Sequence, residues 1–402
     1  MASMALRLLS ARARARRAQG RGPDRISRAG ACARARAASE ASVRRSAATG
    51  AALCTIAAIH PMPACTPGIE PDHDRWSAEP AASSLGRATQ RASGYGWKAV
   101  RMNDFSRDEM VDVLWEHPEK SLAAIWLMEG TQLVAPGPVI PGPIGQGWEA
   151  VNAGDVNSDG MADVLWRNID QNLVAIWLME GSQLLSPGPI IPGPLGQGWK
   201  VVGVSDLNRD GMGDVIWNNK DQNLLTTWMM DGPQLLAPGP IIPGPLGQGW
   251  VARGARDFDR DGMADVLWEN TEQSLIAVWL MDGVQLLAPG PVIPGLGGGF
   301  HVVTARDYNA DGMADVLWND TEQNLMAVWL MEGSTLVISA GPVIPGPPGR
   351  GWKACPAADS NFDGMADVLW YATGTNQAAV WLMNGTQLLA PGPVFLGPYD
   401  GG

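Results

Sequence analysis

Residues 155–166 read DVNSDGMADVLW, and close variants of this stretch recur along the chain after residue 96. The sequence around them divides into six units of 50 to 52 residues, at 97–147, 148–198, 199–249, 250–299, 300–351 and 352–402. A fixed period of this length indicates tandem copies of one structural unit, in which each copy buries apolar side chains against its neighbours.

Each unit contains short apolar runs that are rich in Val, Ile and Trp and are bounded by Gly, Asn, Asp and Pro. This pattern predicts β-strands, and no segment keeps a helical period between the breakers. The run 174–179 is apolar at every position, which is typical of a strand buried on both faces. Four short strands in about 50 residues match one blade of a propeller, so the sequence predicts an all-β fold with six four-stranded blades.

An open solenoid is the alternative for any tandem array. It needs polar capping units at its ends, and the terminal units here show none, so we favour a closed ring. The segment 187–194 is rich in proline, which cannot donate a hydrogen bond to a sheet. We therefore expect it at the outer edge of a blade or in a loop. A ring of seven blades remains an alternative to six.

The stretch 155–163 has the pattern Asp-x-Asn-x-Asp-Gly-x-x-Asp. Oxygen side chains at positions 1, 3 and 5 of a tight loop converge on one point, and glycine at position 6 permits the sharp turn. The carbonyl of position 7 and the Asp at position 9 complete a shell of oxygens, which suits calcium. We call each such segment an Asp loop and number the loops by unit.

Five Asp loops carry this pattern intact. Their candidate calcium ligands, with the methionine contributing its main-chain carbonyl, are Asp155, Asn157, Asp159, Met161, Asp163, Asp206, Asn208, Asp210, Met212, Asp214, Asp257, Asp259, Asp261, Met263, Asp265, Asp307, Asn309, Asp311, Met313, Asp315, Asp359, Asn361, Asp363, Met365 and Asp367. Asp loop 1 has weaker candidates, which are Asp104, Ser106, Asp108 and Asp112. Glu109 replaces its turn glycine, so the sequence leaves open whether this loop binds calcium.

Magnesium ranks second to calcium because it requires a stricter octahedron, and soft metals are disfavoured because no His or Cys recurs with the loops. The loops are not EF-hands, since Trp166 stands where that motif needs Glu. A metal-free turn is the simplest alternative. Against it, several carboxylates within nine residues repel one another unless a cation neutralises them. On this interpretation, Asp163→Ala should lower the melting temperature in calcium and change little in chelator.

Tryptophan recurs in three columns. The second and third columns lie within apolar strands, and we expect them in the core. The first column begins five of the six units, and Phe300 takes its place in the fifth. Its indoles are the better candidates for stacking on sugar rings, although packing is the favoured interpretation. These candidates are Trp97, Trp148, Trp199, Trp250 and Trp352.

The Asp loops and the strands that follow them resemble the FG-GAP and VCBS repeat family, and the resemblance covers residues 97–402. It implies a calcium-binding propeller of the integrin-α-like or lectin-like kind, usually extracellular and serving adhesion or ligand binding. Two features depart from the family. Six units replace the common seven, and a Trp opens five of the six units in place of Phe-Gly.

Charge is divided unevenly along the chain. Residues 1–50 contain 12 of the 29 basic residues and two acidic ones, whereas residues 51–402 contain 17 basic and 39 acidic residues, a formal net charge of −22. Such an acidic body excludes nucleic acid as the expected partner. No apolar run approaches the ~18 residues of a membrane span.

The N-terminal part is interpreted as a targeting or disordered segment (1–75) followed by a linker (76–96). Residues 1–45 resemble a transit peptide, whereas the twin arginine Arg44–Arg45 and the apolar stretch after it suggest a signal peptide within about 40–65. We favour export, and therefore a secreted or cell-surface protein. Only Cys355 of the four cysteines lies in the repeats, which excludes a disulfide framework there.

The sequence leaves three functions open. We favour a propeller that binds calcium and a glycan or cell-surface protein. The first alternative is a structural or adhesive surface module without a soluble ligand, and the second is a hydrolase or lyase that uses Asp carboxylates. Only His117 and His301 lie in the repeats, and neither recurs, so the sequence favours a protein that is not an enzyme. It does not specify the oligomeric state.

Overall fold

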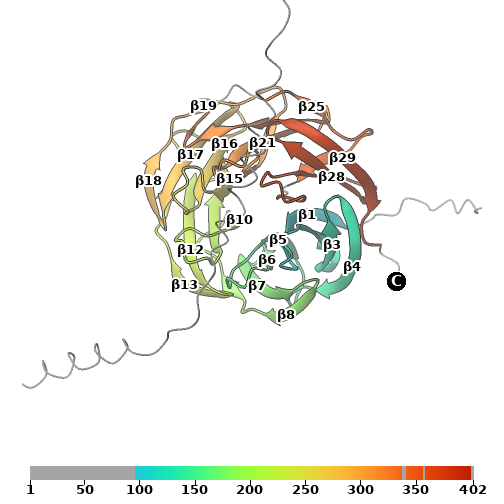
Figure 1. Cartoon of the computed structure of the whole chain (residues 1–402). Coiled ribbons are helices and arrows are strands. Elements are labelled where there is room, and N and C mark those ends of the chain that lie inside the picture. Colours follow the sequence, from blue (N-terminus) through green and yellow to red (C-terminus); the bar gives the residue numbers. More distant parts are fainter. Residues whose placement is uncertain (1–95, 337–340, 356–357, 400–402) are drawn as a thin grey trace, which may run out of the picture. The chain divides into compact units, whose positions relative to one another are not determined.

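The computed structural model describes residues 96–336, 341–355 and 358–399, so the predicted targeting segment and nearly all of the linker lie outside the described residues. Six antiparallel blades are arranged in a ring about a central axis, and the fifth includes a separate two-stranded sheet (Figure 1). The predicted all-β propeller with six four-stranded blades is confirmed. Within the described residues, no helix has the length and apolar character to cross a membrane.

The first three blades follow the first three repeat units. Blade 1 contains β1 (Lys98–Asn103), β2 (Asp112–His117), the short 3-10 helix η3 (Pro118–Lys120), β3 (Leu122–Glu129) and β4 (Gln132–Pro141). Blade 2 contains β5 (Trp148–Gly154), β6 (Asp163–Asn168), β7 (Leu173–Glu180), β8 (Gln183–Pro187) and β9 (Ile191–Pro192). Blade 3 contains β10 (Trp199–Ser205), β11 (Asp214–Asn219), β12 (Leu224–Asp231), β13 (Gln234–Pro238) and β14 (Ile242–Pro243).

The other three blades repeat this arrangement. Blade 4 contains β15 (Trp250–Arg256), β16 (Asp265–Asn270), β17 (Leu275–Asp282), β18 (Gln285–Pro289) and β19 (Ile293–Pro294). Blade 5 contains β20 (His301–Arg306), β21 (Asp315–Asp320), β22 (Leu325–Trp329), β23 (Met331–Glu332), β24 (Thr335–Leu336) and β25 (Ile344–Pro345). Blade 6 contains β26 (Trp352–Cys355), β27 (Val368–Ala372), β28 (Gln377–Asn384) and β29 (Gln387–Leu396).

Chain order and spatial order agree within each blade, with the first strand innermost and the proline-rich strand outermost. The Asp loop joins the first two strands, and antiparallel pairing places all six Asp loops at one end of the ring, which we call the loop face. The turns between the second and third strands lie at the other end, together with the segments that lead to the next blade. We call that end the turn face.

The second and third strands form the buried centre of each blade. All six residues of β16 are buried, and β17 is buried at four consecutive positions from Ile276 to Trp279. Such strands have no solvent face, which explains why the sequence is apolar at every position rather than at alternate ones. The outermost strand differs, because every residue of β8 is exposed.

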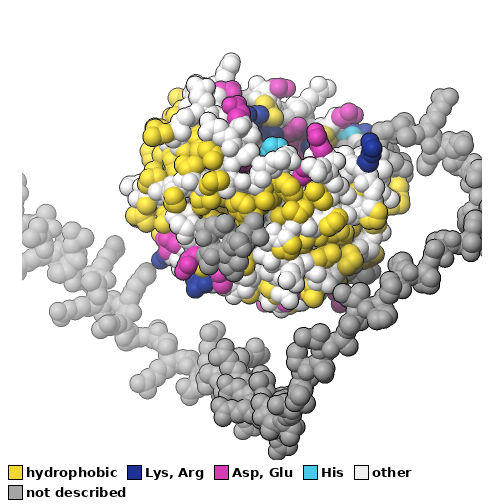
Figure 2. Space-filling view, turned by 90° about the horizontal axis from the view of Figure 1, so that it is seen from above, with side chains coloured by type: hydrophobic (Ala, Val, Ile, Leu, Met, Phe, Trp, Pro, Cys, Tyr) yellow, Lys and Arg dark blue, Asp and Glu magenta, His cyan; other side chains and the backbone are white. Residues whose placement is uncertain are grey.

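Proline interrupts the outer edge of the blades as the sequence predicts. Between β8 and β9 the pairing with β7 is broken, and Gly188 N–H donates to the Ile176 carbonyl at 3.1 Å. Leu185 and Ile190 are about half exposed, and their counterparts make an apolar band across the side of the ring (Figure 2). A proline-blunted edge leaves few free donors for pairing with another sheet.

The ring closes by side-chain packing and a side-chain hydrogen bond, without a shared strand. One apolar cluster lies between each pair of neighbouring blades, and the sixth cluster joins Trp115 and Trp126 of blade 1 to Val380 of blade 6. The Tyr371 hydroxyl donates to the Trp97 carbonyl at 2.8 Å across this junction. Each sheet is built from a single repeat unit, so no strand exchange is needed to hold the last described blade to the first.

Candidate metal centres

Asp loop 2 shows how the first carboxylate shapes each loop. Asp155 Oδ1 accepts the N–H groups of Asn157 at 3.2 Å and Asp159 at 3.3 Å, while Oδ2 accepts that of Gly160 at 2.9 Å. Ser158 and Gly160 have positive φ values of 59° and 86°, which turn these N–H groups inward. The loop therefore wraps around its first carboxylate, and glycine is favoured at position 6 because of its φ.

The last Asp of the loop serves the strands. Asp163 is 1% exposed; its Oδ2 accepts the Val156 N–H at 3.1 Å, and its Oδ1 accepts the Met179 N–H of β7 at 2.9 Å. The same pair of bonds recurs in every blade, from Asp112, Asp214, Asp265, Asp315 and Asp367. Burial raises the pKa of Asp163 to about 7, and its counterparts have pKa values of about 6 to 7.

These bonds change the expectation for Asp163→Ala. The sequence suggested that Asp163 matters only through a cation, and therefore little in chelator. In the structure, its removal leaves two buried N–H donors without acceptors, which costs stability with or without calcium. The sequence could not show this second role, because the partner Met179 lies 16 residues away on another strand.

Position 3 separates Asp loop 4 from the other intact loops. In Asp loop 2, Asn157 Nδ2 donates to Asp159 Oδ2 at 2.8 Å, and loops 3, 5 and 6 repeat this bond at 2.9 to 3.0 Å. Asp loop 4 has Asp259 at this position, which cannot donate. Burial raises the pKa of Asp259, and the neighbouring carboxylates add to this rise.

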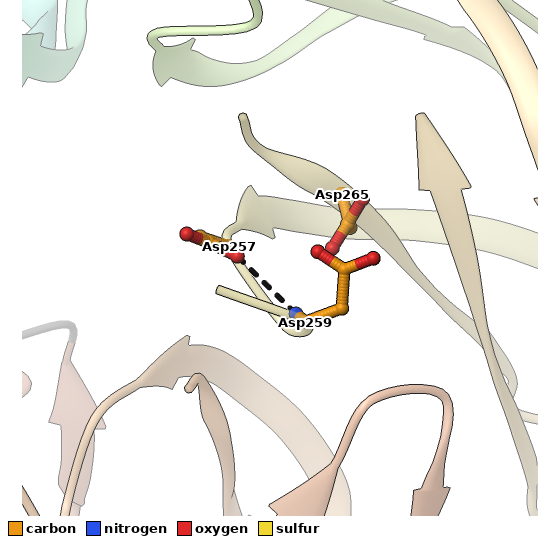
Figure 3. A group of neighbouring side chains, drawn as sticks. All are labelled: Asp257, Asp259 and Asp265. Carbon is orange, nitrogen blue, oxygen red and sulfur yellow. Dashed lines mark hydrogen bonds between the residues drawn. The ribbon is translucent and has the colours of Figure 1, made fainter. Parts of the chain in front are cut away.

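Asp loop 4 therefore brings three carboxylates together. One oxygen each of Asp257, Asp259 and Asp265 lies within 4.8 Å of the others (Figure 3). Calcium binds oxygen at 2.3 to 2.6 Å, so two of its ligands are at most about 5 Å apart. The arrangement thus fits a calcium ion in size, charge and donor type, whereas the other intact loops would first turn their Asn amide oxygen toward the ion.

Asp loop 1 keeps the same backbone with a poorer set of oxygens. Asp104 Oδ2 accepts the Glu109 N–H at 2.8 Å, and Glu109 has a φ of 67°, so a bulky residue occupies the turn that glycine fills elsewhere. The Ser106 hydroxyl oxygen is buried without a hydrogen-bond partner. Burial raises the pKa of Asp104. The sequence-predicted degeneracy therefore affects the ligand set and the strain but leaves the loop conformation intact.

Main-chain hydrogen bonds connect the Asp loops around the loop face. The N–H of Ala162 donates to the Asp104 carbonyl of the preceding loop at 2.7 Å, and equivalent bonds link loops 2 to 3, 3 to 4, 4 to 5 and 5 to 6. Among the described residues, no such bond joins Val111 to Asp359, so the chain of links is open between blades 6 and 1. Side chains add ion pairs at 3.6 Å between Arg209 and Asp261 and between Arg260 and Asp311.

The tryptophan columns lie in the core. The first-column indoles Trp97, Trp148, Trp199, Trp250 and Trp352 are 1 to 5% exposed. Three of them donate Nε1–H to a carbonyl four residues earlier, as Trp199 does to Leu195 at 3.1 Å. Second- and third-column rings contact in every blade, with centroids 4.9 to 5.5 Å apart. The structure thus gives the first column a packing role and leaves no indole face open to a sugar.

A sequence profile of the FG-GAP-like repeat matches the chain five times, at 104–166, 155–217, 206–268, 257–318 and 307–370. Each match runs from one Asp loop to the second strand of the next blade, and together the matches cover more than half of the chain. The chain belongs to the FG-GAP repeat family. No curated protein sequence matches it.

Solved structures resemble this FG-GAP propeller in fold. One is a putative 6-phosphogluconolactonase from Bacteroides uniformis, with 12% identity, a TM-score of 0.49, and coverage of 74% of this chain and 85% of that one. A protein from Lactobacillus plantarum has 13% identity, a TM-score of 0.48 and the same coverages. A virginiamycin B lyase from Staphylococcus aureus has 10% identity, a TM-score of 0.45 and coverages of 76% and 85%. At these values the likenesses carry no information on function.

The turn face of the FG-GAP propeller has a polar pocket that sequence reasoning missed. It lies between blades 3 and 4, has a volume of about 390 Å³, and is lined by Lys220, Asp221, Asn223, Gln248 and Glu272 among others. These residues come from the turns of blades 3 and 4 and from the segment that links the two blades, which the sequence identified only as turns. Their convergence depends on the contact between neighbouring blades and has no signal in either segment alone.

Proposed function

We propose that this FG-GAP propeller is a secreted or cell-surface module that binds calcium at its Asp loops and a glycan or protein ligand elsewhere on the ring. The observation that carries the proposal is the cluster of Asp257, Asp259 and Asp265, whose oxygens lie as close together as ligands of one ion. The other intact Asp loops have the same backbone conformation as Asp loop 4, so we extend the proposal to them, with Asn as a weaker calcium ligand in place of Asp259.

Calcium would be held in Asp loop 4 by Asp257, Asp259, Asp261 and Asp265 together with the Met263 carbonyl. When bound, the ion supplies positive charge that offsets the repulsion among these carboxylates. Hydrogen bonds of the protein hold the loop in place: Asp257 accepts the Gly262 N–H of its own loop, and Asp265 accepts the Met281 N–H of β17. Since neighbouring Asp loops are hydrogen-bonded to one another, ordering one loop supports the next.

The polar pocket on the turn face is where we place the ligand. Amides, carboxylates and an ammonium group converge there, and this mixture suits the hydroxyl groups of a glycan or the polar surface of a protein. We propose binding rather than catalysis, because both histidines of the described repeats have structural neighbours. His117 is buried edge-on against Trp97, and His301 lies 3.4 Å from Glu269.

A calcium titration of the full chain tests the metal part. After exhaustive chelation and dialysis, isothermal titration with calcium gluconate should give about one ion per intact Asp loop, and the melting temperature should rise with calcium concentration. Asp259→Asn should weaken one site, whereas Asp170→Asn, the same change on the turn face, should leave binding unaltered. Absence of both heat and thermal shift would refute the proposal.

A glycan-array screen with and without chelator tests the ligand part. Binding that is reduced by Gln248→Ala, with an unchanged melting temperature, would place the ligand in the turn-face pocket. Asn324→Ala would be a poor control because its amide holds the Pro347 carbonyl, whereas Gln387→Ala on the exposed end of β29 is a suitable one. If no glycan binds, the array result favours a protein ligand or a purely structural module.

A further inference from the structure

Three arginines lie on the innermost strands of three different blades. They are Arg101 on β1, Arg256 on β15 and Arg306 on β20. Arg101 and Arg256 line one small cavity together with Ser205 of blade 3 and Thr304 of blade 5. Innermost strands of blades on opposite sides of the ring face one another only across the central channel, so this cavity belongs to the channel.

Two of these arginines, Arg101 and Arg256, have donor groups without hydrogen-bond partners. Arg101 is 9% exposed, and its Nη1 has no hydrogen-bond partner. Arg256 Nη1 donates to Ser205 Oγ and to the Ala255 carbonyl, but its Nε has no partner. Arg306 Nη2 donates to Asn103 Oδ1 at 3.3 Å. Within the described parts of the chain, neither Arg101 nor Arg256 is paired with a carboxylate.

The electrostatics of the channel are unfavourable for these groups by themselves. Burial lowers the pKa of Arg101 to about 9, and the nearby Arg306 lowers it further in the same direction. Burial also lowers the pKa of Arg256 well below its usual value, with added contributions from Arg306 and Arg101. A guanidinium keeps its proton in proteins, so the positive charges remain and need a negative partner.

Lysine and arginine side chains also line a depression next to the arginine cavity. A depression of about 270 Å³ is lined by Arg167, Lys200, Lys220 and Arg253, and Val202 lines both this depression and the arginine cavity. Arg167 and Arg253 are paired with glutamates, whereas Lys200 and Lys220 pair with no carboxylate among the described residues. Unpaired positive charge at the mouth of a narrow channel raises the local concentration of anions.

We propose that the central channel binds one small monovalent anion such as chloride between Arg101 and Arg256, which line the same cavity. The cavity volume is about 10 Å³, roughly the space of one water molecule. A monatomic anion such as chloride comes nearest to this size, whereas polyatomic oxyanions such as phosphate are much too large. Gly254 adds room, since a Cβ at this position would meet no atom within 4 Å. This inference goes beyond the proposed calcium and ligand binding and does not depend on either.

A thermal-shift experiment on the full chain tests the proposal. The protein is dialysed into gluconate salts, calcium is supplied as gluconate so that calcium and chloride vary independently, and sodium chloride replaces sodium gluconate at constant ionic strength. The melting temperature should rise with chloride, by about 5 °C when chloride reaches a hundredfold excess over its dissociation constant. An unchanged melting temperature would overturn the proposal, as would a rise with phosphate and none with chloride.

Two variants and one control separate the anion from general salt effects. Arg101→Met with Arg256→Met removes two charges and should abolish the chloride dependence. Gly254→Val keeps every charge but fills the free space, and should also abolish it. Arg350→Gln removes an exposed guanidinium and should leave the dependence intact. Loss of the chloride effect in this control would contradict the assignment.

Diffraction provides a measurement that does not depend on the folding of any variant. Crystals of the unaltered chain grown with bromide should show an anomalous peak in the channel between the guanidinium groups of Arg101 and Arg256. A peak without any dependence of the melting temperature on chloride would mean an adventitious ion only and would count against the proposal. Absence of the peak would overturn it directly.

Discussion

Asp loop 1 and Asp loop 4 have the same backbone conformation but differ in the side chains that could bind a cation. In both, the first Asp accepts N–H groups of its own loop, and the last Asp ties the loop to the third strand. Asp loop 4 adds Asp259 and a glycine at φ 83°, whereas Asp loop 1 has Ser106 and a strained Glu109. The hydrogen-bonded frame thus builds the loop, and residues at positions 3 and 6 decide how well it suits a cation.

This separation has a consequence for stability. The frame uses groups that are present in every blade, so removing a frame residue should cost the same in both loops without metal. The ligand set differs, so adding calcium should reveal the difference. Variants of the two loops can therefore be compared pairwise, first in chelator and then in calcium.

The largest effect is expected for the last Asp. Asp265→Ala leaves the N–H groups of Phe258 and Met281 without acceptors in the core, which should lower the free energy of unfolding by roughly 2–6 kcal/mol in chelator. Asp112→Ala should lose a similar amount, because Asp112 makes the same two bonds. In calcium, Asp265→Ala should lose more, since bound calcium stabilises only the native state.

Denaturant unfolding of both variants, with chelator and with calcium gluconate, measures this pair. Gln387→Ala on the exposed end of β29 controls for handling of the variants. If Asp265→Ala matches the unaltered protein in chelator, the double hydrogen bond of the last Asp does not support the fold. If the free energy of unfolding falls equally in Asp265→Ala and Asp112→Ala in calcium, the two loops have equal ligand sets and the comparison fails.

The next effect extends the comparison from the loops to the second strands. Glu116 on β2 is buried and forms one ion pair, with Lys98 at 3.1 Å. Its counterpart Glu269 on β16 instead pairs with Arg253 and accepts the Val302 N–H. Burial raises the pKa of Glu116 to about 7, and Lys98 offsets this only in part. The folded state therefore holds a proton that the unfolded chain has already lost above its pKa of about 4.5.

The sign of the pH dependence follows from this raised pKa. The contribution of Glu116 to stability is fully present below about pH 4.5 and is lost as the pH rises through about 7, a loss of about 3 kcal/mol. Glu116→Gln should remove this slope, while Glu269→Gln should instead destabilise the protein by breaking its pairs. Denaturant melts between pH 5 and 8 in saturating calcium measure the difference, and parallel slopes for Glu116→Gln and the unaltered protein would contradict it.

A smaller effect is expected from converting Asp loop 1 into an Asp loop 4. Glu109→Gly should raise the free energy of unfolding by about 1 kcal/mol, because a side chain at positive φ is strained. Adding Ser106→Asp should give the loop its missing carboxylate. Native mass spectrometry in calcium should then count one ion more than in the unaltered chain, unless Asp loop 1 already binds calcium as it stands. Ser106→Asp without the glycine is the matched control for the turn.

The sequence predicted the fold because its signals are local and repeated. Runs such as Val174–Met179 are apolar at every position, and the prolines after them mark the outer edge, so strand type and blade order follow from neighbouring residues. Six such copies then leave a closed ring as the natural arrangement. The tight turn of the Asp loops could also be predicted from the sequence, because the residues at positions 1 and 6 that form it lie within one short segment.

Features that depend on different blades were not predictable. Arg101 and Arg256 are 155 residues apart, and only ring closure brings them to one cavity. The turn-face pocket joins Asp221 and Gln248 in the same way. The first-column Trp residues were candidates for sugar binding beside the favoured packing role, and contact with the preceding blade buries them, as Trp148 is buried against blade 1.

The smallest effect concerns the arginines that reach from one Asp loop to the next. Arg209 lies 3.6 Å from Asp261, whereas the corresponding residue of the blade before Asp loop 1 is Phe362. Arg209 is half exposed, so Arg209→Ala should change stability by less than about 0.5 kcal/mol. Its charge, however, competes with calcium for Asp261, and its removal should tighten calcium binding by roughly two- to fivefold at low salt. Phe362→Arg should weaken any calcium binding at Asp loop 1 by the same mechanism, and both effects should fade at high ionic strength.

Calcium titrations of the two variants at low and high salt measure these changes in affinity, and affinities that do not respond to salt would show that Arg209 acts by packing instead of charge.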